Sequence, residues 1–291
     1  MIAKGGAMIG DSWHIAAMNC HYRFFSLESF FKDARDAGYT AVEVWCGPMH
    51  FALDWARRDD PQTLTELANR YGMKIIGICP EQTNPKPANM AARGDGAQER
   101  SFATFKNVID VARDTHAGKV VVTSGWGYLD EPREDAWERS VQTLRKVVAY
   151  AVEQGVTPAI EALQRDETNL VRSAEELERL LDDVHDDHLA VCLDLGAAWR
   201  AGDSIDGYFK RFGERVQHLH FSDIGAESHL AWGDGARDMA ADLAALERGG
   251  YAGPISFEIV NSRYHTDPAT ALLQSARQYE KALDTVKEVY Q

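Results

Sequence analysis

The sequence predicts an α/β protein folded as one (β/α)₈ barrel, a TIM barrel, and three observations lead to this fold class. Short apolar runs rich in Val and Ile alternate with longer amphipathic stretches along the chain. Eight such runs begin about 27 to 45 residues apart, a spacing typical of β-α units. No G-x-G-x-x-G turn follows the first run, which disfavours an open, doubly wound sheet. Because no linker or break in composition interrupts the chain, we expect a single domain over residues 1–291.

Eight segments are expected to form the strands, because each is short, apolar and bounded by Gly, Pro or polar residues. In chain order they are Trp13–Asn19, Thr40–Trp45, Met73–Cys79, Gly118–Ser124, Val156–Ala162, Leu189–Asp194, Val216–Phe221 and Pro254–Val260. The carboxyl ends of the strands in such a barrel meet at one mouth, where this fold carries its binding residues.

The segments between the strands have the periodicity of amphipathic helices, so eight helices are expected in strict alternation with the strands. Ser26–Ala37 carries its apolar residues on one stripe, and Gly38 follows as a typical helix end. The same reasoning predicts helices over Asp135–Gln154, from a capping box of Ser173 and Glu176, and from Asp267–Pro268 towards Tyr290.

Charge and cysteine content narrow the classes of function. Lys and Arg total 31 against 45 Asp and Glu, a formal net charge of −14, which opposes binding to nucleic acid or anionic membranes. No stretch approaches the roughly 20 apolar residues of a membrane span. Met1–Asp11 does not resemble a signal peptide, and four cysteines without a C-x-x-C pair fit a reduced compartment. We expect a cytoplasmic protein that binds neither nucleic acid nor membrane; its oligomeric state stays open, a homo-oligomer included.

Ionisable residues stand near the ends of four consecutive expected strands. They are Glu161, Asp194, His220 and Glu258. Because side chains alternate along a strand, all four are expected to point into the barrel mouth. One such residue alone is commonly a solvated rim residue or a helix cap, but four at the same ends of neighbouring strands indicate a site.

The chemistry of this group predicts a metal centre. Converging carboxylates repel one another, and burying an unpaired charge costs several kcal/mol. A divalent cation removes that penalty, and three carboxylates with one imidazole suit Mn²⁺, Mg²⁺, Co²⁺ or Zn²⁺. The oxygen-rich set favours Mn²⁺. We therefore expect one divalent ion per chain, held by Glu161, Asp194, His220 and Glu258.

Four further residues follow expected strand ends and are expected at the rim of the pocket as substrate-binding residues. They are His50, Glu81, Trp126 and His229. The indole of Trp126 could offer an apolar face to a substrate, with packing between loops as the structural alternative.

Other residues near the expected mouth are given structural roles. Alternation puts Val216 and His218 on the same face as His220, one or more layers deeper, so His218 is expected to be buried and hydrogen-bonded. Cys20, Cys46 and Cys79 end the first three strands and are expected to be small buried hydrophobes rather than soft-metal ligands.

The order and spacing of several motifs resemble one superfamily. They are E-V-W in the second strand, I-E-A-L, C-L-D-L-G, H-L-H-F-S-D, and the tail W-G-D-G-A…L-x-x-G-G-Y-x-G-P-I-S-F-E. From about Trp13 to Leu283 the chain resembles the xylose-isomerase-like barrels, which include ketose 3-epimerases, hydroxypyruvate isomerase, inosose dehydratase and endonuclease IV. The segments E-V-W-C-G-P-M-H-F-A-L-D, I-I-G-I-C-P-E-Q-T-N and N-M-A-A-R look most like the fructoselysine 3-epimerase type.

The resemblance implies a divalent-metal-dependent sugar epimerase or isomerase that acts next to the carbonyl of a ketose or ketosamine. In ketose 3-epimerases the strand-borne Glu, Asp, His and Glu bind the metal, and these roles map to Glu161, Asp194, His220 and Glu258. The two glutamates also move protons there. Two carboxylates on opposite sides of a substrate could remove a proton from one face and return it to the other through an enediolate.

Two departures from the family pattern stand out. Ala197 replaces the histidine of a D-x-x-H motif, which argues against a multinuclear site of the endonuclease IV kind. His229, in D-I-G-A-E-S-H-L, looks like the counterpart of a substrate-binding basic residue, in a loop of altered length. An inosose-type dehydratase, an aldose–ketose isomerase or cleavage of an oxidised sugar conjugate remain alternatives. A DNA-repair hydrolase conflicts with the net charge, and a non-catalytic barrel leaves both glutamates unexplained.

Overall fold

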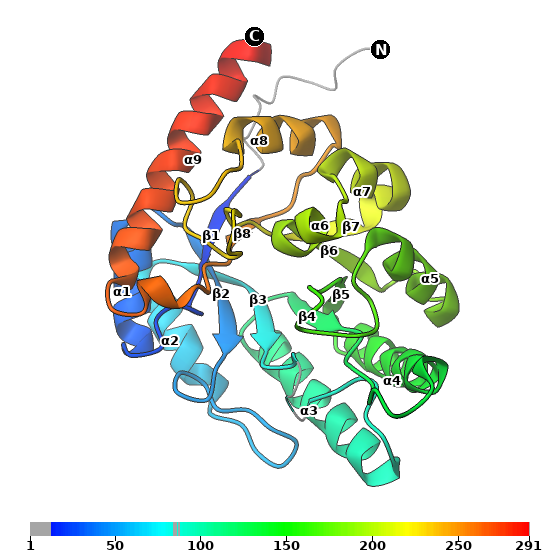
Figure 1. Cartoon of the computed structure of the whole chain (residues 1–291). Helices are drawn as coiled ribbons and strands as arrows, with labels where there is room; N and C mark the ends of the chain where they lie inside the picture. Colours follow the sequence, from blue (N-terminus) through cyan, green and yellow to red (C-terminus); the bar gives the residue numbers. More distant parts are fainter. Residues whose placement is uncertain (1–12, 84–85, 87, 291) are drawn as a thin grey trace.

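Eight parallel strands close into a barrel in the order β1 to β8, with β8 paired to β1 (Figure 1). The structure is a computed structural model and describes residues 13–83, 86 and 88–290. The strands are β1 Ile15–Met18, β2 Ala41–Cys46, β3 Lys74–Pro80, β4 Lys119–Thr123, β5 Thr157–Glu161, β6 Ala190–Asp194, β7 Val216–His220 and β8 Ile255–Phe257. Each overlaps its expected segment, and the predicted (β/α)₈ barrel is confirmed.

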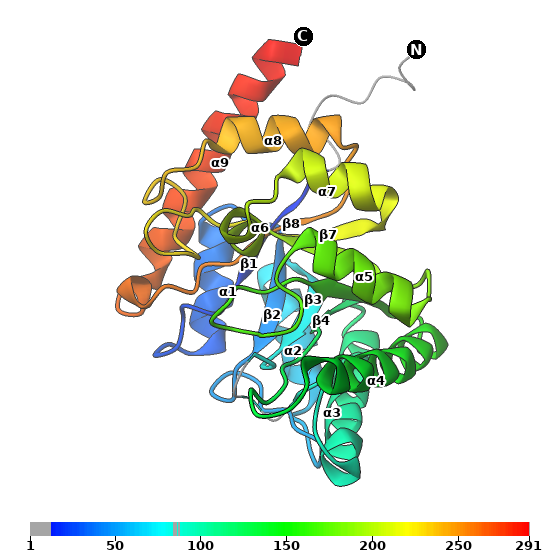
Figure 2. The same ribbon diagram turned by 45° about the vertical axis from the view of Figure 1, so that its right-hand side comes forward.

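The helices lie outside the strands, as Figures 1 and 2 show. They are α1 Leu27–Asp36, α2 Pro61–Tyr71, α3 Asp95–Asp114, α4 Arg133–Glu153, α5 Ala174–Val184, α6 Leu195–Ala201, α7 Ile205–Phe212, α8 Met239–Arg248 and α9 Pro268–Tyr290. The expected strict alternation fails at one crossover, where both α6 and α7 follow β6. Gly202 in the left-handed conformation ends α6, and the Ser204 side chain caps α7, so one stretch of chain becomes two helices.

Side-chain caps explain where two expected helices begin. Ser26 accepts a hydrogen bond from the Ser29 amide at the start of α1. Ser173 accepts from the Glu176 amide at 3.2 Å, while the Glu176 carboxylate accepts from the Arg172 amide at 2.8 Å. The expected capping box is therefore present, except that the Glu176 carboxylate accepts from the amide of Arg172 and not from that of Ser173.

Apolar side chains form two separate layers. Outward-facing residues such as Ile160, Leu193 and Phe257 join the large core between strands and helices. The barrel interior is filled by smaller clusters, one of which contains Ala159 and Cys192. Small interior residues leave room above them for polar groups at the mouth. The buried positions expected for Cys20, Cys46 and Cys79 are confirmed.

Two shifts in register break the simple alternation of side chains. Val191 pairs with Val216, but Cys192 pairs with His218, so Gln217 is an extra residue in β7. Val216 therefore packs in the outer core with Val191, and the expectation that it shares a face with His218 is wrong. A second shift, between Val42 and Glu43 of β2, lies against β3.

Among the described residues, no helix combines the length and apolar character needed to cross a bilayer. The segment Met1–Asp11, to which the expectation about a signal peptide refers, lies outside the described residues.

Candidate active site

The four residues expected to bind a metal lie together at the carboxyl ends of β5 to β8. Each offers one ligand atom, and these atoms lie within 4.8 Å of one another in Glu161, Asp194, His220 and Glu258. Glu161, Asp194 and His220 are the last residues of β5, β6 and β7, and Glu258 directly follows β8. The rule that strand ends converge thus placed this group correctly.

The imidazoles of His220 and His229 join the carboxylates of the cluster. His220 Nδ1 lies 2.6 Å from Glu161 Oε1 and 3.3 Å from Glu258 Oε2. His229 Nε2 lies 3.4 Å from Glu258 Oε2 and 3.6 Å from Asp194 Oδ2. His229 therefore contacts the cluster directly, from the loop between β7 and α8.

The two carboxylate oxygens of Asp194 have different surroundings. Oδ1 accepts the Ala197 amide hydrogen and caps α6. Oδ2 is buried, and no hydrogen bond reaches it from the described part of the chain. A buried carboxylate oxygen without a donor is costly. The cluster of three carboxylates and one imidazole fits a hard divalent cation, which would give Oδ2 a closer partner than the His229 imidazole at 3.6 Å.

Burial and neighbouring charges give the three carboxyl groups of the cluster different pKa values. Burial raises the pKa of Glu258 to about 7, against the opposing effect of His220 and His229. Burial also raises the pKa of Glu161, again opposed by His220. Burial also favours a higher pKa for Asp194, but the interaction with His229 outweighs burial, and the pKa of Asp194 is lowered. Glu258 is thus a carboxyl group able to hold or release a proton near neutrality.

Glu43 is a buried functional candidate that the sequence reasoning missed. It lies in β2, and its side chain is 0% exposed. Its Oε2 lies 2.8 Å from His218 Nε2 and its Oε1 lies 3.2 Å from His220 Nε2. Burial raises the pKa of Glu43, but the two histidines outweigh it and hold that pKa well below its usual value. The signal was present as an acidic residue inside an apolar strand, in E-V-W.

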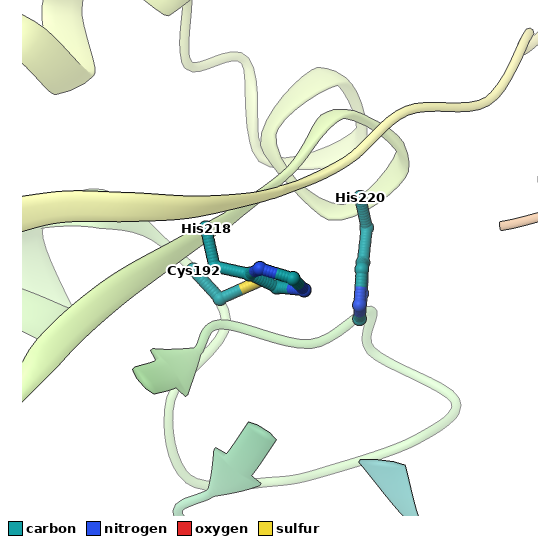
Figure 3. A group of neighbouring side chains, drawn as sticks. All are labelled: Cys192, His218 and His220. Atoms are coloured by element: carbon teal, nitrogen blue, oxygen red, sulfur yellow. The ribbon is translucent and has the colours of Figure 1, made fainter. Parts of the chain in front are cut away.

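The layer beneath the cluster contains His218 and Cys192. Figure 3 shows the rings of His218 and His220 projecting to the same side of β7, with Cys192 beside His218. The expectation that His218 is buried and hydrogen-bonded is confirmed by its bond to Glu43. Cys192 Sγ lies 3.8 Å from Glu161 Oε1, so this layer touches the candidate ligands.

A cavity of about 130 Å³ opens beside the cluster and is lined by Glu161, Asp194 and Glu258. Two of the expected rim residues, Glu81 and His229, also line it.

A larger neighbouring pocket, of about 540 Å³, shares the wall formed by Pro80 and Glu81 and contains Trp126. His50 lies beyond these linings, where its Nδ1 lies 2.8 Å from Asn19 Nδ2 and its Nε2 lies 3.0 Å from the Phe25 carbonyl oxygen.

Comparison with known proteins agrees with this geometry. Residues 31–289 match the family described as xylose isomerase-like TIM barrel. Fructoselysine 3-epimerase of Shigella flexneri is 27% identical over 267 residues, 91% of this chain and 96% of that protein. L-ribulose 3-epimerase of Methylomonas sp. (strain DH-1) is 30% identical over 238 residues, 79% of this chain and 77% of that protein.

A solved structure of an L-ribulose 3-epimerase superposes with a TM-score of 0.78 at 23% identity, covering 95% of this chain and 96% of that one. The resemblance to ketose 3-epimerases, and with it the expectation of an enzyme of the sugar isomerase and epimerase class, is confirmed. The chain belongs to the xylose isomerase-like TIM barrel family.

Proposed function

We propose that this chain is a divalent-metal-dependent 3-epimerase of a ketose or a ketosamine. The observation that carries the proposal is the cluster of Glu161, Asp194, His220 and Glu258 beside a cavity at the barrel mouth. Two curated relatives named 3-epimerases align with most of the chain and support epimerisation over the other reactions of this barrel.

The four clustered residues would hold the cation, with Mn²⁺ as the ion that their oxygen-rich set favours. When bound, such an ion polarises the substrate carbonyl and the neighbouring hydroxyl group, and stabilises negative charge on both oxygens. Asp194 supports this role, because Oδ1 already caps α6 while Oδ2 accepts no hydrogen bond from the described residues and has only the longer contact of 3.6 Å with His229 Nε2.

Glu161 and Glu258 are the proposed proton-transfer pair. They belong to β5 and β8, which lie three strands apart around the barrel, so they can face a substrate from different sides. One carboxylate removes the proton beside the carbonyl, and the other carboxyl group returns a proton to the opposite face. In the metal-free protein the pKa of Glu258 is raised to about 7, so before the cation binds this carboxyl group can hold or release a proton near neutral pH.

The rim residues are proposed to orient the sugar. His229 lies against both Asp194 and Glu258 and can donate a hydrogen bond to a substrate oxygen near the reacting carbon. Glu81 stands where the small cavity meets the larger pocket, and Trp126 offers an apolar surface inside that pocket. A substrate contact by His50 stays a prediction.

The test is a panel of free ketoses and ketosamines incubated with Mn²⁺, with products separated by chromatography and identified by NMR. We expect a 3-epimer, its loss after treatment with EDTA, and its loss in Glu161→Gln and Glu258→Gln. Glu214→Gln is the matched control, since Glu214 is exposed and precedes β7 on the opposite side of the barrel from the mouth. Absence of any epimer across the panel with metal bound would refute the proposal.

Two further products would reassign the reaction while keeping the site. An aldose would identify an aldose–ketose isomerase. A dehydrated or cleaved product would identify an inosose-type dehydratase or a lyase acting on an oxidised sugar conjugate. Each begins with removal of a proton beside a carbonyl, so the same two glutamates would be required.

A further inference from the structure

Glu43 crosses the barrel interior to reach the strand that carries the candidate metal ligand His220. It belongs to β2, and β7 lies three strands away around the ring. The carboxylate lies 2.8 Å from one imidazole and 3.2 Å from the other, one oxygen for each histidine. Glu43, His218 and His220 are all fully buried.

Local structure makes room for this carboxylate. A shift in register pairs Glu43 with Gly77 of β3. A Cβ atom at Gly77 would stand 3.4 to 3.5 Å from Cγ, Cδ and Oε1 of Glu43, which is already contact distance. Any larger side chain at Gly77 would therefore push the carboxylate from its place between the two histidines.

The hydrogen-bond geometry determines which nitrogen of His220 a cation would bind. An ionised carboxylate only accepts hydrogen bonds, so the nitrogens that face Glu43 must carry hydrogen. Nδ1 faces carboxylates as well, Glu161 Oε1 at 2.6 Å and Glu258 Oε2 at 3.3 Å, so without metal both ring nitrogens of His220 carry hydrogen. A cation held by the cluster would replace the hydrogen on Nδ1, and Glu43 would keep the hydrogen on Nε2.

We propose that Glu43 is a positioning residue of the candidate metal centre, whose carboxylate orients His220 and fixes the tautomer that directs Nδ1 at the cation. The inference rests on the proposed function, since it assumes that the four-residue cluster binds metal. His218 is the second donor to the same carboxylate and fixes its orientation. Outer carboxylates of this kind orient metal-bound imidazoles and raise their basicity.

The surroundings argue against a merely space-filling glutamate. A buried carboxylate in an apolar strand is costly unless it is fully paired, and an apolar side chain would fill the same volume without that cost. His218 Nδ1 has no hydrogen-bond partner among the described residues. The hydrogen bond between His218 Nε2 and Glu43 is therefore the one that satisfies this buried ring.

The experiment compares Mn²⁺ affinity in three variants of the full chain, measured from the electron paramagnetic resonance signal of free Mn²⁺. Glu43→Met removes both acceptor oxygens and is expected to weaken binding about 10- to 100-fold. Glu43→Gln keeps the size and one acceptor oxygen, so its loss is expected to be smaller. Val121→Ala is the control for a structural defect, because Val121 is a buried residue of the barrel interior. It should lower the melting temperature and leave Mn²⁺ affinity unchanged.

A second readout reports the tautomer directly. In the Zn²⁺-loaded protein, ¹H–¹⁵N correlations should show hydrogen on Nε2 of His220, with its proton signal shifted downfield by the hydrogen bond to Glu43 in wild type and moved upfield in Glu43→Met. At saturating metal the turnover number of Glu43→Met should recover towards wild type, because the defect lies in holding the ion.

Equal losses of affinity in Glu43→Met and Val121→Ala, or none in the former, would overturn the inference. If Glu43→Met does not fold, unchanged affinity in Glu43→Gln overturns it. A wild type that binds Mn²⁺ but epimerises no ketose would refute the proposed function, and the affinity comparison would still decide the role of Glu43.

Discussion

Replacing Glu258 by Gln should make the metal-free protein more stable than wild type at alkaline pH. Burial raises the pKa of Glu258 to about 7 in the folded state, against about 4.3 in an unfolded chain. A raised pKa means that folding favours the protonated carboxyl. The protonated Glu258 carboxyl therefore stabilises the folded state most below the pKa of the unfolded chain, about 4.3, and this stabilisation is lost as pH rises through about 7.

The size of the effect follows from the shift. Each unit of pKa difference corresponds to 1.36 kcal/mol, so wild type should lose at most about 4 kcal/mol from this group between acidic and alkaline pH. A glutamine stays neutral throughout and loses nothing. The free energy of unfolding of Glu258→Gln relative to wild type should therefore rise with pH by up to that amount.

The assay is urea unfolding in EDTA at a series of pH values from about 4 to about 9, followed by circular dichroism and tryptophan fluorescence. Glu214→Gln, at an exposed position, should track wild type at every pH. A stability difference between Glu258→Gln and wild type that is flat with pH, or that falls as pH rises, would refute the assigned environment of Glu258.

Three further predictions concern the metal and the proton-transfer pair. Asp194→Ala should lose both the metal and the α6 cap, which costs about 0.5–2 kcal/mol of stability in EDTA. Asp194→Asn keeps an acceptor for the Ala197 amide and should lose the metal alone, and elemental analysis with urea unfolding separates the two cases. Metal at about 100 times its dissociation constant should raise the stability of wild type by about 2.7 kcal/mol and leave Asp194→Asn unchanged in thermal melts. Glu161→Gln and Glu258→Gln should each lower turnover at saturating metal by about 10²–10⁴-fold, and substantial epimerisation by both variants would contradict the pair.

The fold and the four clustered residues could be predicted because both depend on rules that hold locally. Alternation of apolar runs and amphipathic stretches identifies β-α units, and a closed barrel brings every strand end to one mouth. Glu161, Asp194, His220 and Glu258 were identified by their places at strand ends, without any knowledge of loop structure.

What the sequence did not reveal depends on register and on loop paths. The extra residue in β7 turns Val216 to the outer core, and strict alternation along a strand cannot anticipate such a bulge. Glu43 was noticed within a motif, but its partners are about 175 residues away, so its role appears only when β2 and β7 face each other. The contacts of His50 with Asn19 and Phe25 likewise depend on how two loops meet.

The most direct test of the proposed chemistry is proton exchange in D₂O, followed by NMR and mass spectrometry of the recovered sugar. With Mn²⁺ and a ketose that the protein epimerises, we predict one deuterium at carbon 3 of the epimer and none at carbon 1. The same incubation with Asp194→Asn, or with wild type in EDTA, should leave the sugar unlabelled. Epimerisation without deuterium at carbon 3, or labelling that persists in Asp194→Asn, would contradict metal-assisted proton transfer by Glu161 and Glu258.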